Sequence, residues 1–377
     1  HWMVHSFPTR RSSDLLLKAA YNYQVLVEFE LATEAYEEFV RLFPDHKEAG
    51  NSLFNAAALR EENGQYMQAV SLYQQYLGRY ASETDAAQVS FTIGRLYEKI
   101  SDTNGAMNAY TEYAKRGPDD AARMSEAYFR WGKLLEERGN YGEAEKRYLQ
   151  SVAVFVKAKQ VDPQTNAAFA AESQFRIADH YYQEYKAMVF TGNMQRDSQV
   201  LKTKAEMFKK LKVYYEEVVT FGNYKWATAS LHMIGMINQE FSEALLTAPV
   251  PEDLDPEMQD EYVFKLEEIA FPIKNRALEA FKQNVQKGID ERLINDWIVQ
   301  SYLQLKKLEP ATVEPKFEVP DVAERPAFAT ADLDGEIPAM PAPPTVPGAT
   351  PPATTPPTGG GGQQLAPADE AGQEVAQ

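Results

Sequence analysis

The sequence predicts an all-α fold, a right-handed α-solenoid in which helix-turn-helix units stack along the chain. Four repeat alanines are spaced 37, 37 and 38 residues apart, at Ala32, Ala69, Ala106 and Ala144. An aromatic residue follows each of them four positions later, at Tyr36, Tyr73, Tyr110 and Tyr148. A small residue precedes each of them by twelve positions, at Ala20, Ala57, Gly94 and Gly132. A fixed period of this length is typical of helical repeats, and no single unit can bury its apolar stripe without a neighbour.

The small residues predict where the two helices of one unit approach each other. Two helices come close only where small side chains meet, so we expect Gly94 to face Ala106 and Gly132 to face Ala144. The aromatic residues lie on one face of the second helix, because positions three and four apart are neighbours there. We expect these rings to fill the space toward the next unit.

Turn signals and apolar periodicity then divide the first part of the chain into four helix pairs. Asn63-Gly64, Asn104-Gly105 and Gly139-Asn140 separate the two helices of the second, third and fourth pairs. The expected pairs are Leu16–Val27 with Phe29–Phe43, Lys47–Asn63 with Tyr66–Tyr80, Asp85–Ile100 with Asn104–Arg116, and Ala121–Arg138 with Tyr141–Lys159.

The second part of the chain repeats the pattern with longer and less regular elements. Ala178 and Gly235 occupy the small position, and Ala277 with Phe281 repeats the alanine-aromatic pair. The sequence around Pro272 predicts that a new helix starts there or that the helix bends. The expected helices are Asn166–Phe190, Val200–Phe221, Lys225–Leu246, Glu257–Ile269, Arg276–Gln286 and a capping helix Glu291–Lys307, near fourteen in the whole chain.

The two ends of the chain are set apart from this helical body. Residues 5–15 resemble the translation of a common sequencing adapter, so we interpret residues 1–15 as a non-native artefact. The native start is then missing, which leaves a signal peptide or a lipid anchor open. Residues 310–377 are rich in Pro, Ala, Thr and Gly and predict a disordered acidic tail. Four regular repeats (16–160) and divergent repeats with a capping helix (161–309) lie between these ends.

Composition and motifs argue against several classes of function. The net charge is −17, and the segment from Glu309 to Gln377 contributes eleven acids and two bases. A nucleic-acid partner is not expected, since such binding rests on clustered Lys and Arg. The chain has no cysteine, no phosphate-binding loop, no nucleophile-elbow motif and no histidines at metal-ligand spacing. We therefore expect no catalytic residue, no cofactor and no metal, and also no spanning helix, because no run of 18 apolar residues occurs.

The first helix of each unit carries the candidate partner-binding groove. A phenylalanine lies three positions before the small residue, at Phe54, Phe91, Phe129 and Phe175. Arg95, Lys133 and Tyr182 lie on the same predicted face. An aromatic floor with a charged fringe suits an extended peptide or a partner helix. The alternative, given equal weight, is that the rings only seal adjacent helices.

Two further clusters are interpreted as ordinary surface. The lysines between Lys202 and Lys212 predict the solvated face of a long helix, with contact to an acidic partner or a lipid head group as the alternative. Glu61-Glu62 and Glu136-Glu137 are interpreted as solvated helix ends.

The repeat pattern, carried most clearly by residues 50–152, resembles that of the tetratricopeptide repeat (TPR) proteins. The resemblance runs from Leu16 to about Leu308, although the period is stretched by about three residues over the usual ~34. Residues 215–251 and 266–281 are similar to TPR proteins of Gram-negative envelopes, such as gliding-motility and outer-membrane assembly proteins. The resemblance implies a non-enzymatic scaffold that binds other proteins, periplasmic or associated with the outer membrane. The alternatives are a cytoplasmic adaptor or co-chaperone of the same fold and a solenoid with an unrecognised activity.

Overall fold

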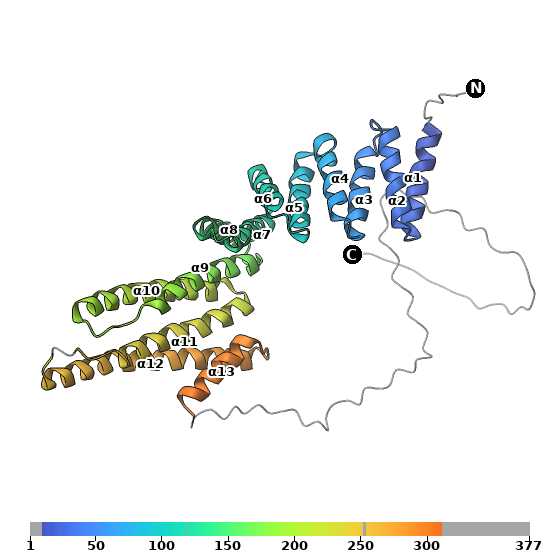
Figure 1. The fold of residues 1–377 in the computed structure, drawn as a ribbon. Helices are drawn as coiled ribbons and strands as arrows, with labels where there is room; N and C mark the ends of the chain where they lie inside the picture. Colours follow the sequence, from blue (N-terminus) through green and yellow to red (C-terminus); the bar gives the residue numbers. More distant parts are fainter. Residues whose placement is uncertain (1–9, 118, 252–253, 311–377) are drawn as a thin grey trace, which may run out of the picture. The chain divides into compact units, whose positions relative to one another are not determined.

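The computed structural model describes residues 10–117, 119–251 and 254–310, and every regular element within these ranges is a helix (Figure 1). The all-α prediction is therefore confirmed. The expected tail from residue 310 onward lies outside the described residues, apart from Pro310 itself. The first eight helices are α1 (Arg10–Val25), α2 (Phe29–Leu42), α3 (Ala49–Glu62), α4 (Tyr66–Arg79), α5 (Glu83–Lys99), α6 (Thr103–Arg116), α7 (Ala121–Glu137) and α8 (Tyr141–Val161).

The later helices are longer and differ more from the expected bounds. They are α9 (Ala168–Ala187), α10 (Met194–Phe221), α11 (Tyr224–Leu246), α12 (Pro256–Asp290) and α13 (Asp296–Leu308). Each helix contacts the next one along the chain, and α7 with α9, α9 with α11, and α11 with α13 also touch. Consecutive stacking of this kind is how helical repeats bury a continuous core.

Side-chain caps explain many of the helix starts. Ser82, Asp102, Asp120 and Asn140 each accept a hydrogen bond from the main-chain N–H three residues later. Such caps satisfy one of the free N–H groups of a first helical turn. Four further starts have the same arrangement, at Asn193, Asn223, Asp255 and Asn295.

The expected bounds of three elements were wrong. The capping helix α13 begins at Asp296, five residues after the expected Glu291, and Asn295 caps it. The helix α10 begins at Met194, six residues before the expected Val200, because Asn193 caps it and the Asp197 carboxylate accepts hydrogen bonds from the main-chain N–H groups of Thr191 and Gly192. The helix α12 continues through Pro272, so the two expected helices are one. A proline inside a helix removes one hydrogen bond, and the neighbours Ala270 and Ile273 are buried in the core on either side of it.

The helix α1 begins at Arg10, inside the segment interpreted as an artefact. Ser13 is buried at 1% exposure, so part of that segment packs as helix. The non-native origin of residues 1–15 and the division of the body at residue 160 remain predictions.

In the third and fourth units the small residue of the first helix contacts an aromatic ring of the second helix. A Cβ added to Gly132 would lie 2.7 Å from the ring of Tyr148, and one added to Gly94 would lie 2.7 Å from the ring of Tyr110. The small residue therefore faces the aromatic ring four positions after the repeat alanine. At Gly132 the expected contact with Ala144 is present as well, since the added Cβ would lie 3.2 Å from the main-chain oxygen of Ala144, whereas at Gly94 the three nearest atoms all belong to Tyr110. In α11 and α12 the same contact joins Gly235 and Phe281. The repeat pattern thus extends to this last long pair.

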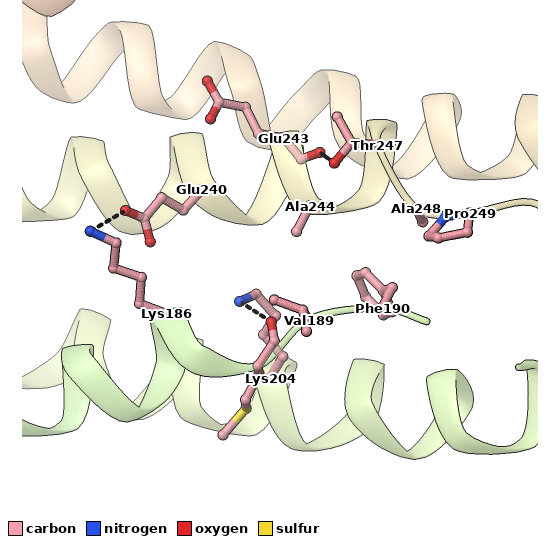
Figure 2. Close-up of a pocket in the computed structure, with 11 residues that line it drawn as sticks. Lys186, Val189, Phe190, Lys204, Glu240, Glu243, Ala244, Thr247, Ala248 and Pro249 are labelled. Atoms are coloured by element: carbon pink, nitrogen blue, oxygen red, sulfur yellow. Dashed lines mark hydrogen bonds and ion pairs between the residues drawn. The ribbon is translucent and has the colours of Figure 1, made fainter. Parts of the chain in front are cut away.

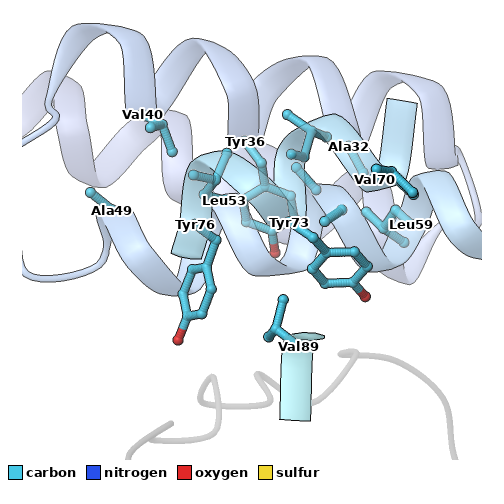
Figure 3. Packing of buried hydrophobic residues seen from close by; sticks show 14 of the residues in the cluster. Ala32, Tyr36, Val40, Ala49, Leu53, Leu59, Val70, Tyr73, Tyr76 and Val89 are labelled. Carbon is cyan, nitrogen blue, oxygen red and sulfur yellow. The ribbon is translucent and has the colours of Figure 1, made fainter. Parts of the chain in front are cut away.

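The first part of the core is a continuous row of buried alanines and tyrosines. Ala32, Ala57 and Ala69 are fully buried, and Tyr36 and Tyr73 are nearly so. Figure 3 shows these tyrosines with Leu53, Val70 and Val89 between successive helices. Each unit therefore completes its core with side chains of the next unit.

Candidate functional site

The candidate groove phenylalanines lie on α3, α5, α7 and α9, and three of the four are buried. Phe91, Phe129 and Phe175 are 5%, 7% and 7% exposed, while Phe54 is half-buried. An exposed ladder of four rings is therefore not present. The rings instead seal the helices, which is the alternative that the sequence left open.

The partners of each ring explain this burial. The centroid of the Phe91 ring lies 5.8 Å from that of Tyr110 and 5.3 Å from that of Tyr113, both on the second helix of the same unit. Phe129 contacts Tyr148 and also Phe169 of the next unit, at 6.2 and 5.4 Å. Aromatic pairs at these separations stabilise a core beyond their buried area. A contact between these rings and a partner stays a prediction.

A second column on the same helices is polar and regular. Glu61, Glu98 and Glu136 each accept a hydrogen bond from the tyrosine hydroxyl twelve residues later, at Tyr73, Tyr110 and Tyr148. In the first unit Gln24 takes this place and accepts from Tyr36 at 3.0 Å. The interpretation of Glu61 and Glu136 as merely solvated helix ends was wrong, because both are half-buried acceptors.

Two arginines that the sequence analysis missed connect these carboxylates across units. Arg130 on α7 lies 3.0 Å from Glu98 on α5 and 2.7 Å from Glu126 one turn away on its own helix. Arg176 on α9 repeats this arrangement with Glu136 at 3.2 Å and Glu172 at 2.9 Å. A glutamate four residues before each arginine was the available signal. The resulting Tyr–Glu–Arg network comprises Tyr110, Glu98, Arg130, Tyr148, Glu136 and Arg176.

The network keeps its tyrosines protonated. Burial raises the pKa of Tyr110 and of Tyr148, and the nearby carboxylates Glu98 and Glu136 raise the pKa of these hydroxyls further. A tyrosine that stays neutral remains a hydrogen-bond donor. Burial also raises the pKa of the Asp179 carboxyl, and Glu136 adds to that effect. The pairs Glu98–Arg130 and Glu136–Arg176 join adjacent first helices, and their side chains remain 25% to 34% exposed.

A hollow of about 500 Å³ lies above this network, between α5, α7 and α9. Its wall includes Phe129, Arg130 and Lys133 of α7, together with carboxylates from all three helices. Lys133 is exposed and lies 3.8 Å from Glu137, and Arg95 is exposed on the neighbouring α5. The full lining is Glu98, Ser101, Thr103, Phe129, Arg130, Lys133, Leu134, Glu137 and Glu172.

Tyr182 does not join this surface. Its hydroxyl donates to Glu240 on α11 at 2.5 Å, and its ring is 6% exposed. The structure thus brings Phe129 and Lys133 together at one hollow and places Tyr182 in the packing between α9 and α11. None of the described helices is both long and apolar enough to cross a bilayer.

Paired helices, the alanine-aromatic repeat and the contacts between successive units define a helical-repeat protein with the fold of the TPR class. Comparisons with known proteins point to repeats of the same kind. The family model of the soluble NSF attachment protein (SNAP) matches residues 8–161. The photosystem I assembly protein Ycf3 of Synechococcus sp. (strain CC9605) is 22% identical over 106 residues, which are 27% of this chain and 61% of that protein. The chain thus spans less than two thirds of this curated relative.

Solved structures that match this chain include two TPR proteins. One is from Parabacteroides merdae, with 16% identity, a TM-score of 0.36, and coverage of 79% of this chain and 98% of that chain. The other is the C-terminal part of a TPR protein from Cytophaga hutchinsonii, with 15% identity, a TM-score of 0.37, and coverage of 80% and 95%. A crystal structure of the MamA protein has 12% identity, a TM-score of 0.36, and coverage of 57% and 98%.

Proposed function

We propose that this chain is a non-enzymatic scaffold that holds a segment of another protein on the first-helix face of α5, α7 and α9. The hollow beside Lys133 carries this proposal. The Tyr–Glu–Arg network holds the side chains of its floor in place. Binding a partner would therefore cost little conformational entropy in the scaffold. Lys133 lines the hollow as an exposed cation, and Arg95 is exposed on the neighbouring α5.

These two cations suggest the kind of partner segment. Glu98, Glu126, Glu136 and Glu172 are already paired with Arg130 or Arg176, so the exposed positive charges select acidic or polar residues of the partner. The net charge of −17 supports a protein partner in preference to nucleic acid. The Synechococcus relative is an assembly protein, and an assembly scaffold is a role that such a face would support.

The compartment is part of the same proposal. The similarity of residues 215–251 and 266–281 to envelope TPR proteins supports a periplasmic or outer-membrane-associated scaffold in a Gram-negative bacterium. A cytoplasmic adaptor is the alternative. The native upstream sequence discriminates between them, because a signal peptide or a lipid-attachment motif would support the envelope.

A charge-reversal experiment tests the binding face. Peptides selected from a random phage-displayed library on the intact chain are labelled, and their affinity is measured by fluorescence anisotropy. We expect the double variant Arg95→Glu with Lys133→Glu to weaken binding about ten-fold or more, because the two new glutamates would repel the acidic residues of the bound peptide.

The matched control is the double variant Lys115→Glu with Lys146→Glu on the second helices. Both lysines are exposed, and each pairs with a glutamate three residues earlier. We expect less than a two-fold change, roughly 0.4 kcal/mol, for this variant. Equal loss in both variants, or no selected peptide at all, would contradict the proposed face.

A further inference from the structure

A second cavity, of about 470 Å³, lies between the α9–α10 segment and α11, away from the proposed binding face (Figure 2). One wall consists of Met188, Val189 and Phe190, which follow α9, and the other of α11 side chains with Ala248 and Pro249. A Cβ added to Gly192 would lie 3.2 Å from Pro249, so the two loops meet at one end. The volume is in the range of small-molecule sites, which are concave, mostly apolar and carry a few placed polar groups.

The unusual group in this cavity is the ammonium of Lys204 on α10. This residue is only 2% exposed, so the prediction of a solvated lysine face was wrong for Lys204. Its Nζ donates to the main-chain oxygens of Tyr185 at 2.8 Å and Met188 at 3.0 Å. Figure 2 shows the amine reaching into the space beside Val189. A lysine ammonium has three N–H groups, so these two carbonyls leave one for a further acceptor. The Nζ also lies 4.1 Å from the centre of the Tyr185 ring.

The carboxylates near Lys204 form their hydrogen bonds and ion pairs with other residues. Glu240 accepts the Tyr182 hydroxyl at 2.5 Å and lies 4.0 Å from Lys186. Glu243 is exposed at the edge and accepts from Gln239 at 2.9 Å. Both acceptors of Lys204 are neutral carbonyls, and burial lowers its pKa. The Glu240 carboxylate acts on Lys204 in the opposite direction but forms no hydrogen bond with it. A buried cation whose hydrogen-bond acceptors are neutral is costly, and an anion entering from the cavity would offset more of that cost.

The remainder of the cavity offers apolar contact. Val189 is 63% exposed, and Phe190, Ala244 and Pro249 also line the cavity. We propose that this cavity binds a small carboxylate with an apolar body. Its carboxylate accepts the third N–H of Lys204, and its apolar part lies against Val189, Phe190 and Ala244.

The test uses the full chain and sodium hexanoate, a simple carboxylate of this class. Isothermal titration should give a Kd of about 1 mM or tighter for hexanoate, and at least ten-fold weaker binding for 1-hexanol, which lacks the charge. Lys204→Met should weaken hexanoate binding at least ten-fold, while Lys202→Met on the exposed side of α10 should leave it unchanged.

A second variant covers the case in which Lys204→Met fails to fold. Ala244→Phe fills the cavity from α11 and leaves Lys204 and its two carbonyls in place, so it should abolish hexanoate binding without lowering the melting temperature. The proposal is overturned if hexanoate does not bind at about 10 mM, if hexanol binds equally well, or if folded Lys204→Met or Ala244→Phe protein binds hexanoate like the unaltered chain.

Discussion

Gly132→Leu is expected to destabilise the chain by about 3 kcal/mol, the upper end of the range for an overpacked contact. A Cβ at this position would already lie 2.7 Å from the Tyr148 ring and 3.2 Å from the main-chain oxygen of Ala144. Tyr148 cannot give way freely, because it is fully buried and its hydroxyl is hydrogen-bonded to Glu136. Urea unfolding followed by circular dichroism measures the loss.

Gly142→Leu is the matched control, since Gly142 is the other helical glycine of the same unit. A Cβ there would meet nothing within 4 Å. Leucine has the better helix propensity, so this variant should be neutral or more stable by up to about 1 kcal/mol. Equal stability of the two variants would show that α7 and α8 do not meet at Gly132 and that the assigned repeat register is wrong.

Stability should also fall on acidification through one buried histidine. His232 on α11 is 7% exposed, its Nδ1 lies 3.0 Å from the Ser301 hydroxyl of α13, and the rings of Phe281 and Trp297 lie beside it. Burial lowers the pKa of His232 from 6.5 to about 4. The folded chain therefore resists protonation of a group that the unfolded chain protonates readily.

The lowered pKa of His232 determines how stability changes with pH. Above about pH 6.5 the histidine is neutral in both states and its contribution is fully present. As the pH falls toward about 4, the unfolded state takes up the proton and stability drops by roughly 3 kcal/mol. Urea unfolding at several pH values between about 7 and 4 measures the drop.

His232→Gln should reduce this pH dependence by the same amount, because glutamine does not titrate. Other groups titrate in both proteins, so the difference between the two curves isolates His232. Parallel curves for the two proteins would mean that His232 is open to water in the folded chain.

Much of the fold could be predicted from the sequence, because the same position can be compared between successive repeats of one chain. The repeat alanines and the tyrosines four positions later are buried, and most helix starts fall within two residues of the prediction. Prediction was poorer where a single local contact decides the outcome. Asp197 turns back to hold the loop before α10, and Pro272 is tolerated because its neighbours pack tightly. Neither contact leaves a periodic signal.

The candidate site was predicted in part. Glu61 and Glu136 were noted only as solvated helix ends, and Arg130 and Arg176, which recur in only two units, were overlooked. The phenylalanines were placed on the correct helices, yet spacing alone does not tell whether a ring points into a groove or under a neighbouring tyrosine. The burial of Lys204 was not predicted, because Lys204 and Lys202 belong to the same lysine cluster and differ only in the side of α10 on which they lie.

The central claim is that a partner segment lies along the first helices and not along the second. A photo-reactive residue is placed singly at Ala58, Arg95 or Lys133, which follow the small residue of three successive first helices. It is also placed at Ser71, Asn108 or Lys146, exposed positions that follow the repeat alanine on the second helices by two residues. With a selected peptide bound, cross-linking is expected from Arg95 and Lys133, and more weakly from Ala58 at the edge of the proposed surface. Cross-linking from Ser71, Asn108 or Lys146 with none from Arg95 and Lys133 would contradict the proposed binding face.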